Sequence, residues 1–432
     1  MTRILFTTNA MNGHVRPGLQ IAHELASAGH EVLWYTGPEY EPLVKNSGVG
    51  FTPINAELKF DNEALKPGLL RFNKLVLDVF LNRVPGYVAD LAVLFDTFGP
   101  QVVVADHAFM AGPLLAEKRG IPRVAFSTGP LNLSSADTAP FGTGLRPSAT
   151  PLGRWRNRSL YWVMRTLLLR EAQQVAARIR ADMGLAPMDG FFIDWAALIA
   201  DRYLQSGIPE FEYPRSDLPP SVEFVGATHA TGMDDWAPPP WWPDIAVARN
   251  DGRPVVFVTQ GSAATDPVNL VLPAISALAG ADMLVVATSG GRDPRQVLPA
   301  AGRPANLRIE DFIPFTEILP LADVMVTNGG YGGVQTALAH GLPLVAVGTA
   351  EDHMEVNARV AWSGAGVSLR TDRPSPARIG AAVAAVLGDP AYRARARQLK
   401  DAYARYPGAP RAAQIILETA AAYRPPLDAA PH

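Results

Sequence analysis

The sequence predicts an α/β protein with two doubly wound parallel-sheet domains that face each other across a cleft. Three observations lead to this fold class. Short apolar segments alternate with amphipathic helical segments along most of the chain, which is the pattern of successive β-α-β units. The alternation is interrupted by a proline- and tryptophan-rich connector, Pro238–Pro243, and then restarts. A length of 432 residues also suits two domains better than one.

The first half of the chain enters a strand at once and continues through β-α-β units. Proline opens and glycine closes its expected helices, as is typical of helix ends. We expect strands over 3–8, 31–36, 101–106 and 122–127, a helix over 17–28 closed by Gly29, and a second helix that ends at Gly120.

The second half repeats the pattern and ends in helices. We expect strands over 254–259, 283–288, 307–312, 324–327 and 344–347, and helices over 376–387, 391–403 and 410–423. These elements divide the chain into an N-terminal domain (1–215), a linker (216–250), a C-terminal domain (251–405) and a last helical segment (406–432), which we expect to return to the first domain.

Composition excludes several classes of protein. The net charge is −3, which gives no support for a polyanionic partner, so we expect no nucleic-acid binding. The chain has no cysteine and therefore no disulfide or thiolate metal site, in keeping with a reducing compartment. The longest apolar helical segment, 159–170, contains Arg165 and is too short to span a bilayer. We expect a cytoplasmic monomer or homodimer without stable membrane insertion.

The most informative segment is a glycine-rich loop between two apolar strands, 324–327 and 344–347. Four glycines in this loop let the backbone approach a ligand closely, and they lie where a helix begins: Gly329, Gly330, Gly332 and Gly333. Free N–H groups and the positive end of the helix dipole would together suit a diphosphate. A tight strand-to-helix turn without a ligand would use the same glycines. Neither a phosphate-loop lysine nor the dehydrogenase glycine fingerprint is present.

A histidine and an aspartate follow two strands of the first domain. His14 lies after the first strand and Asp106 ends the strand 101–106, so both are expected at the carboxyl edge of one sheet. Histidine is the side chain best suited to general base catalysis near neutral pH, and a carboxylate can orient it. Each residue also has an ordinary interpretation, His14 as a loop residue and Asp106 as a helix cap, and His107 is a competing partner.

Taken together, five segments resemble the inverting nucleotide-sugar glycosyltransferases of the two-domain GT-B fold. Within that family the resemblance is closest to bacterial antibiotic and natural-product transferases, including those of macrolides. The segments are Gly13-His14-x-x-Pro17, Asp106, Gly261-Ser262, Phe312-Ile313-Pro314 and the block 324–358.

The resemblance implies a role for each of these residues. His14 would deprotonate the acceptor hydroxyl and Asp106 would orient it. The nucleotide diphosphate would be bound by Gly13, Ser262, Phe312, Ile313, Asn328, Gly330, Gly332, Gly333, Val334 and Thr336, with the pyrimidine at Ile313 and the phosphates at Ser262 and the amides of 332–334. The donor sugar would be bound by Glu351, Asp352 and His353.

The chain departs from the family pattern at three places. Asn328 replaces a phosphate-binding histidine, and Thr336, next to Gln335, replaces a ribose-binding glutamate. Glu351-Asp352-His353 stands where an Asp-Gln pair is usual.

The implied reaction moves a hexose, glucose or a deoxysugar, from a UDP- or TDP-sugar to a hydroxyl of a hydrophobic polyketide, macrolide, ansamycin or phenol. The nucleotide sugar is a co-substrate, and no cofactor or metal is expected, since the sequence has no Asp-x-Asp pair. Two alternatives remain open at this point: a nucleotide-sugar epimerase, which would need two carboxylates in the cleft, and a non-catalytic nucleotide-sugar-binding accessory protein.

Overall fold

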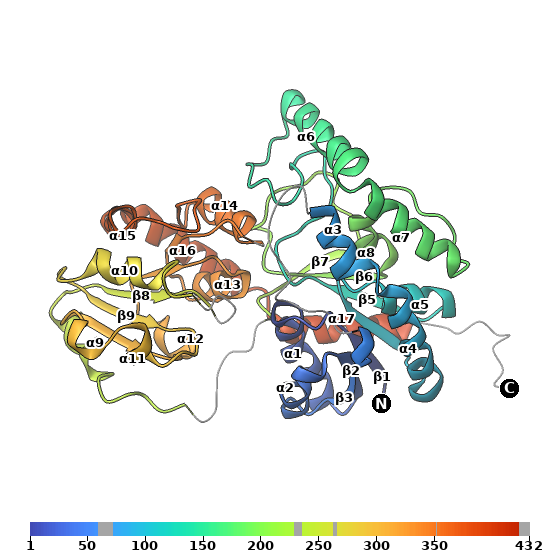
Figure 1. Ribbon diagram of the computed structural model, residues 1–432, viewed down its shortest axis with the longest axis horizontal. Coiled ribbons are helices and arrows are strands. Elements are labelled where there is room, and N and C mark those ends of the chain that lie inside the picture. Colours follow the sequence, from blue (N-terminus) through green and yellow to red (C-terminus); the bar gives the residue numbers. More distant parts are fainter. Residues whose placement is uncertain (59–71, 229–235, 262–265, 351, 423–432) are drawn as a thin grey trace.

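The computed structural model describes residues 1–58, 72–228, 236–261, 266–350 and 352–422. Each half of the chain forms a parallel sheet with helices on both faces (Figure 1). The first sheet has seven strands in the order β3-β2-β1-β4-β5-β6-β7. Its strands are β1 (Arg3–Thr7), β2 (Glu31–Thr36), β3 (Gly50–Pro53), β4 (Val102–Asp106), β5 (Arg123–Phe126), β6 (Arg202–Ser206) and β7 (Val222–Gly226).

The second sheet has six strands in the order β10-β9-β8-β11-β12-β13. They are β8 (Val255–Thr259), β9 (Leu284–Thr288), β10 (Leu307–Glu310), β11 (Val324–Thr327), β12 (Leu344–Ala346) and β13 (Gly366–Ser368). The predicted fold class is confirmed: both halves are Rossmann-like. In each sheet the first strand in the sequence lies centrally, with β1 between β2 and β4 and β8 between β9 and β11. Doubly wound sheets bind ligands outside the carboxyl ends of the strands at this point.

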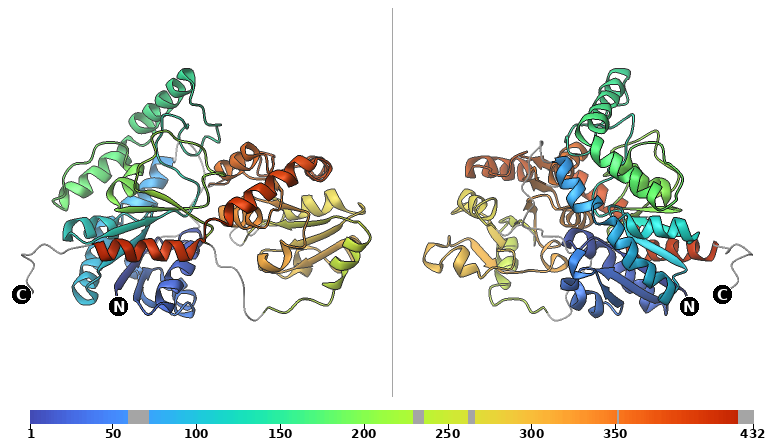
Figure 2. Two further views of the ribbon diagram at one scale, coloured as in Figure 1. Left: turned by 180° about the vertical axis from the view of Figure 1, so that it is seen from behind. Right: turned by 45° about the vertical axis from the view of Figure 1, so that its right-hand side comes forward.

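The helices cover both faces of the two sheets (Figure 2). Those between strands of the first half are α1 (Asn12–Ser27), α2 (Glu41–Asn46), α3 (Phe72–Val76), α4 (Val84–Phe98), α5 (Ala111–Arg119), α6 (Pro151–Val163), α7 (Arg170–Asp182) and α8 (Trp195–Ile199). Those of the second half are α9 (Pro243–Asn250), α10 (Val271–Leu278), α11 (Pro294–Val297), α12 (Phe315–Ile318), α13 (Tyr331–Ala339), α14 (His353–Ser363), α15 (Pro376–Gly388), α16 (Pro390–Tyr403) and α17 (Ala409–Ala422). None of the described helices is long and apolar enough to cross a membrane.

The central strands are apolar along their whole length because both of their faces are covered. All residues of β4, β8, β9 and β11 are buried. Continuous Val-rich segments are typical of strands in a parallel sheet covered by helices on both sides. Alternate residues of β8 point to opposite faces, so Phe257 joins one apolar cluster and Val256 another.

Two segments join the halves. The range 216–250 contains β7, the last strand of the first sheet, and α9 in addition to connecting chain, so the connection between the sheets is shorter than that range. Helix α17 crosses back and packs beside α1 on the first sheet (Figure 2). Its Ala412, Ile415 and Ile416 are buried in the same apolar cluster as residues of β1 and β4.

Candidate active site

The structure brings His14 and Asp106 into contact at the carboxyl edge of the first sheet. Strands β1 and β4 are neighbours, so the residues at their carboxyl ends meet. The His14 Nδ1 atom lies 3.0 Å from Asp106 Oδ1, and both side chains are buried. The pair therefore stands at the point of the sheet where a doubly wound fold binds its ligands.

The helix that carries His14 begins earlier than predicted. The expected start at Pro17 is wrong, because α1 begins at Asn12 and Pro17 lies inside it. Met11 is the N-terminal boundary residue with extended backbone, and its carbonyl accepts from the amides of His14 and Val15 at 2.9 and 3.0 Å. His14 is thus fixed in the first turn of a helix rather than in a loop. Gly13 precedes it, and a Cβ at Gly13 would meet nothing within 4 Å.

Backbone groups hold the Asp106 carboxylate in place. Its Oδ2 accepts from the Asn9 amide at 2.7 Å, and its Oδ1 accepts from the Ala108 amide at 2.8 Å. Burial alone would raise the pKa of Asp106, but the charge and hydrogen bond of His14, the charge of His107 and the Asn9 amide outweigh it and lower the pKa. An ionised Asp106 favours a proton on His14 Nδ1, which leaves Nε2 as the basic nitrogen. No sequence motif pointed to Asn9.

Among the described residues, the hydrogen-bond partner of the ring of His107, the competing candidate, is Thr128 and not His14 or Asp106. Its ring stacks on His14 with centroids 6.2 Å apart and an angle of 12° between planes. Burial, only partly offset by Asp106, lowers the pKa of His107 to about 4. His107 is therefore neutral at neutral pH, and its Nδ1 lies 3.4 Å from the Thr128 amide as an acceptor.

The glycine-rich loop lies at the corresponding point of the second sheet. Thr259 and Thr327 are paired at the ends of β8 and β11. Each threonine hydroxyl accepts from the amide two residues later, Gly261 in one loop and Gly329 in the other, at 3.2 Å. Both glycines have positive φ, 71° and 95°, a conformation that glycine adopts more readily than other residues.

Helix α13 starts in this loop and offers two of the three predicted amides. The Val334 amide, which was also predicted to bind phosphate, donates to Gly330 O at 3.0 Å, the first hydrogen bond of the helix. Within the described part of the chain no such bond engages the amides of Gly332 and Gly333. These two amides and the helix dipole remain suited to an anion.

The residues at which the chain departs from the family pattern form hydrogen bonds to other parts of the protein. Asn328 Oδ1 lies 3.4 Å from the Gly330 amide and so belongs to the turn itself. The Thr336 hydroxyl donates to Gly332 O at 2.8 Å, inside its own helix. Gln335 is fully buried and donates to the Ser206 hydroxyl of the first half at 3.1 Å, which directs it away from the loop.

Asn357 ties the glycine-rich loop to the next one, a contact that the sequence did not predict. Its Nδ2 donates to the carbonyls of Val347 and Gly348 at 3.0 Å. Its Oδ1 would lie only 2.0 Å from a Cβ at Gly329, so the Asn357 carboxamide fills the space beneath that glycine. Asn357 is itself 1% exposed and cannot move aside easily.

The other residues predicted to bind the donor lie around the carboxyl edge of the second sheet, as far as the structure describes them. Phe312 is 49% exposed, whereas Ile313 is buried in the core. Strand β10 ends at Glu310, so Phe312 follows the strand instead of belonging to it. His353 opens α14, and its amide donates to Ala350 O at 2.9 Å. Ser262 and Glu351 lie outside the described residues.

The two carboxyl edges face each other. Tyr331, at the start of α13, donates its hydroxyl hydrogen to Ser206 O at the end of β6, at 2.7 Å. A Cβ on Gly129, which follows β5, would lie 3.3 Å from Asp352 Oδ2, just before α14. The loops that follow the strands of one sheet therefore contact those of the other.

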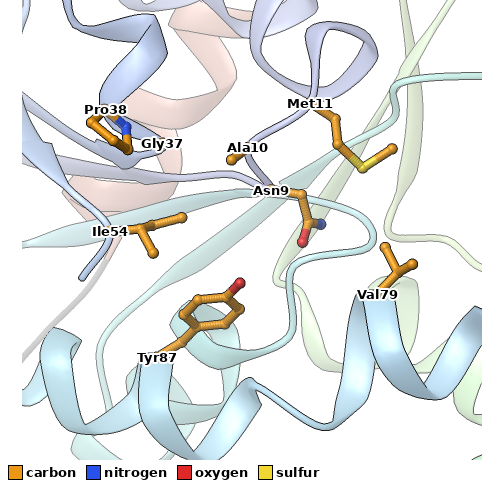
Figure 3. A pocket seen from close by; sticks show the side chains of 8 residues that line it. All are labelled: Asn9, Ala10, Met11, Gly37, Pro38, Ile54, Val79 and Tyr87. Atoms are coloured by element: carbon orange, nitrogen blue, oxygen red, sulfur yellow. The ribbon is translucent and has the colours of Figure 1, made fainter. Parts of the chain in front are cut away.

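An apolar recess adjoins the His14–Asp106 pair through Asn9, and Figure 3 shows the side chains that line it. Its lining comes from the carboxyl ends of the first three strands and from two helical segments: Asn9, Ala10, Met11, Gly37, Pro38, Ile54, Val79 and Tyr87. Asn9, which binds Asp106, is shared by the recess and the pair. In the described residues, no group of three or more His, Cys, Asp or Glu side chains could hold a metal ion.

Comparison with known sequences gives one consistent result. Residues 274–419 match the family described as erythromycin biosynthesis protein CIII-like, C-terminal domain. The chain is 41% identical to 4′-demethylrebeccamycin synthase from Lentzea aerocolonigenes, over 93% of this chain and 96% of that protein. It is 34% identical to UDP-glycosyltransferase 2 from Phaeomoniella chlamydospora, over 90% of each.

Solved structures share the fold. The calicheamicin glycosyltransferase CalG4 superposes with a TM-score of 0.76 at 24% identity, and 98% of this chain and 100% of that chain are covered. The glycosyltransferase VinC, solved with DTDP, gives a TM-score of 0.69 at 22% identity, with 97% and 100% covered. At these identities the likeness establishes the two-domain GT-B architecture.

Proposed function

The chain belongs to the UDP-glycosyltransferase family of natural-product glycosyltransferases, and on that premise we propose that it is an inverting, metal-independent enzyme. It moves a hexose, glucose or a deoxysugar, from UDP or TDP to a hydroxyl of a hydrophobic natural product. The observation that carries the proposal is the buried His14–Asp106 pair, with Nδ1 and Oδ1 3.0 Å apart at the carboxyl edge of the first sheet.

His14 acts as the general base in this proposal. Asp106 fixes the proton on Nδ1, and Nε2 takes the acceptor proton as the acceptor oxygen attacks the anomeric carbon. The attack comes from the face opposite the diphosphate, so the anomeric configuration inverts. Asp106 stabilises the imidazolium as it forms, through the contact that already lowers the pKa of the carboxyl.

The leaving diphosphate is stabilised at the start of α13. The amides of Gly332 and Gly333 and the helix dipole meet the charge that develops as the glycosidic bond breaks. Because the amides are preorganised, no metal is required for this step. In this proposal the backbone of Ile313, beside the half-exposed Phe312 beyond β10, contacts the pyrimidine, and Asp352 and His353 at the start of α14 contact the sugar.

The acceptor assignment rests on the apolar recess and on a relative. The recess near His14 has an apolar lining that includes Ala10, Ile54, Val79 and Tyr87. The relative at 41% identity is named for 4′-demethylrebeccamycin, a natural product. A hydrophobic natural-product acceptor agrees with both observations.

Nucleotide titration in the presence of EDTA tests the donor half of the proposal. We expect UDP or TDP to raise the melting temperature, while GDP and NAD do not, because the site is built for a pyrimidine diphosphate without metal. A nucleotide at 100 times its Kd adds about 2.7 kcal/mol of stability, which a thermal-shift assay detects easily. Absence of a response to both pyrimidine diphosphates, or a response that EDTA abolishes, would contradict the donor assignment.

A further inference from the structure

One loop of the first half joins the neighbourhood of the His14–Asp106 pair to the donor side. This segment, residues 128–144, follows β5 and is called the bridging loop below. At its start the Thr128 amide lies 3.4 Å from the Nδ1 of His107, whose ring stacks on His14. One residue later, Gly129 lies against Asp352 at the start of α14. The position of the bridging loop therefore affects both sides of the site.

A single carboxylate of α14 holds the far end of the bridging loop. Glu355 Oε1 accepts from the amides of Gly142 and Gly144 at 2.9 and 2.8 Å. Both glycines have positive φ, 90° and 58°, and this local turn directs their two amides at one oxygen. Glu355 is 4% exposed, so these hydrogen bonds are shielded from water.

Arg359, one turn further along α14, links Glu355 to the near end of the loop. Its guanidinium lies 2.9 Å from Glu355 Oε2 and 2.6 Å from Glu212 Oε1 of the first half. Glu212 Oε2 in turn accepts from the Leu131 amide at 3.0 Å. The guanidinium also stacks over the Tyr213 ring, 4.1 Å from its centroid.

The carboxylates around Arg359 are ionised and are neutralised by arginines. Burial alone would raise the pKa of Glu212, but Arg359 and Arg215 outweigh it and lower the pKa. Glu212 and Glu355 are thus matched by two arginines, and all of their side chains are buried. Apolar residues of similar volume would stabilise an interface as well as a buried ion network does. The specific contribution of the ion network is to fix the position of the bridging loop, because its carboxylates accept hydrogen bonds from amides at both ends of that loop.

We propose that Glu355 and Arg359 are positioning residues that clamp the bridging loop onto α14, so that donor sugar and acceptor meet His14 in one arrangement. The proposal rests on the proposed function and adds to it a role for two residues outside the catalytic pair and the nucleotide site. In the described part of the chain no hydrogen bond or ion pair joins Glu355 or Arg359 to Gly332, Gly333 or Phe312, so nucleotide binding should survive loss of the clamp.

Three measurements on Glu355→Gln and Glu355→Ala test the clamp. Hydrogen exchange of peptides covering 131–145 should accelerate on the order of tenfold or more in Glu355→Ala and less in Glu355→Gln, which keeps an acceptor oxygen. The kcat for transfer from UDP-glucose to 4-methylumbelliferone should fall in the same order, by about tenfold or more for alanine. The Kd for UDP should stay within about twofold of the wild-type value. A loss of 1.4 kcal/mol of binding free energy would instead raise the Kd about tenfold.

The matched control is Glu210→Gln. Glu210 pairs with Arg405 across the same two halves of the chain, but this pair is partly exposed, and no hydrogen bond or ion pair among the described residues joins the two side chains to the bridging loop. Glu210→Gln should leave exchange, kcat and Kd unchanged.

Each contrary result has a distinct meaning. Unchanged exchange of 131–145 in Glu355→Ala would overturn the clamp. Faster exchange with unchanged kcat, or loss of UDP binding together with kcat in Glu355→Gln, would overturn the positioning role. If the wild-type protein bound UDP but transferred no sugar to any acceptor hydroxyl, the proposed function would fail, and the exchange data would still decide whether the clamp exists.

Discussion

Replacement of His14 by alanine is expected to lower kcat for glycosyl transfer by about 10² to 10⁴-fold, the usual contribution of a general base. The acceptor hydroxyl would then have to lose its proton to water while it attacks. The Kd for UDP should hardly change, because His14 lies on α1 in the first half of the chain and the amides proposed to bind the diphosphate lie at the start of α13 in the second half. Steady-state kinetics together with calorimetric titration of UDP measure both quantities.

His23 supplies a control on the same helix. It is exposed on α1, where its Nδ1 lies 3.1 Å from Ser47 O, and His23→Ala should keep full activity. Asp106→Asn should lower kcat by a comparable factor to His14→Ala, because a carboxamide can hold His14 in the wrong tautomer. An active His14→Ala enzyme would rule out His14 as the base.

Replacement of Gly329 by alanine is expected to weaken nucleotide binding strongly, with a rise in the Kd for UDP of about 100-fold or more (about 2.7 kcal/mol). The residue has φ of +95°, and the new Cβ would lie 2.0 Å from Asn357 Oδ1. Since Asn357 is buried and bonded to Val347 and Gly348, the loop has to move instead, and the amides of Gly332 and Gly333 move with it. Calorimetric titration with UDP measures this loss.

Gly252→Ala separates the clash from the backbone strain. Gly252 also has positive φ, +74°, but a Cβ there meets nothing within 4 Å. That variant should lose about 1–2 kcal/mol of stability from left-handed backbone strain and keep its affinity for UDP. If Gly329→Ala behaved like Gly252→Ala, the glycine-rich loop would not be the diphosphate site.

Much of the fold could be predicted because buried parallel strands are continuous apolar segments. The bounds of β2 and β11 agree with the sequence pattern, and five other predicted strands differ by one residue at one end. Four strands, β3, β6, β7 and β13, were not predicted from the sequence. The start of α1 was mistaken because Pro17 suggested a first helical position, whereas an earlier boundary residue, Met11, starts the helix. No local pattern separates these two starts.

The site could be predicted only in part, because many of its contacts join residues that lie far apart in the sequence. Strand order places His14 beside Asp106, so that contact followed from the fold. The spacing of Glu355 and Arg359 on one helix face is visible in the sequence, but their partners Gly142 and Glu212 lie far away in the chain. Contacts of this kind depend on how the two halves pack, which periodicity does not encode.

Two alternatives to glycosyl transfer were left open by the sequence, a nucleotide-sugar epimerase and a non-catalytic accessory protein, and both are now disfavoured. The family relatives are glycosyltransferases, which argues against an epimerase. The carboxylate of the first sheet is committed to His14 and to the Asn9 and Ala108 amides, instead of standing free as an acid or base. A non-catalytic accessory protein would have no use for a buried and oriented His14–Asp106 pair.

The most direct test of the account is the anomeric configuration of the product formed from UDP-α-glucose in the presence of EDTA. Proton NMR of the glycoside made from a phenolic acceptor such as 4-methylumbelliferone reports it. Attack directed by His14 from the face opposite the diphosphate predicts the β-glucoside, formed without metal. An α-glucoside, or a β-glucoside that appears only when a divalent metal is restored, would contradict the mechanism.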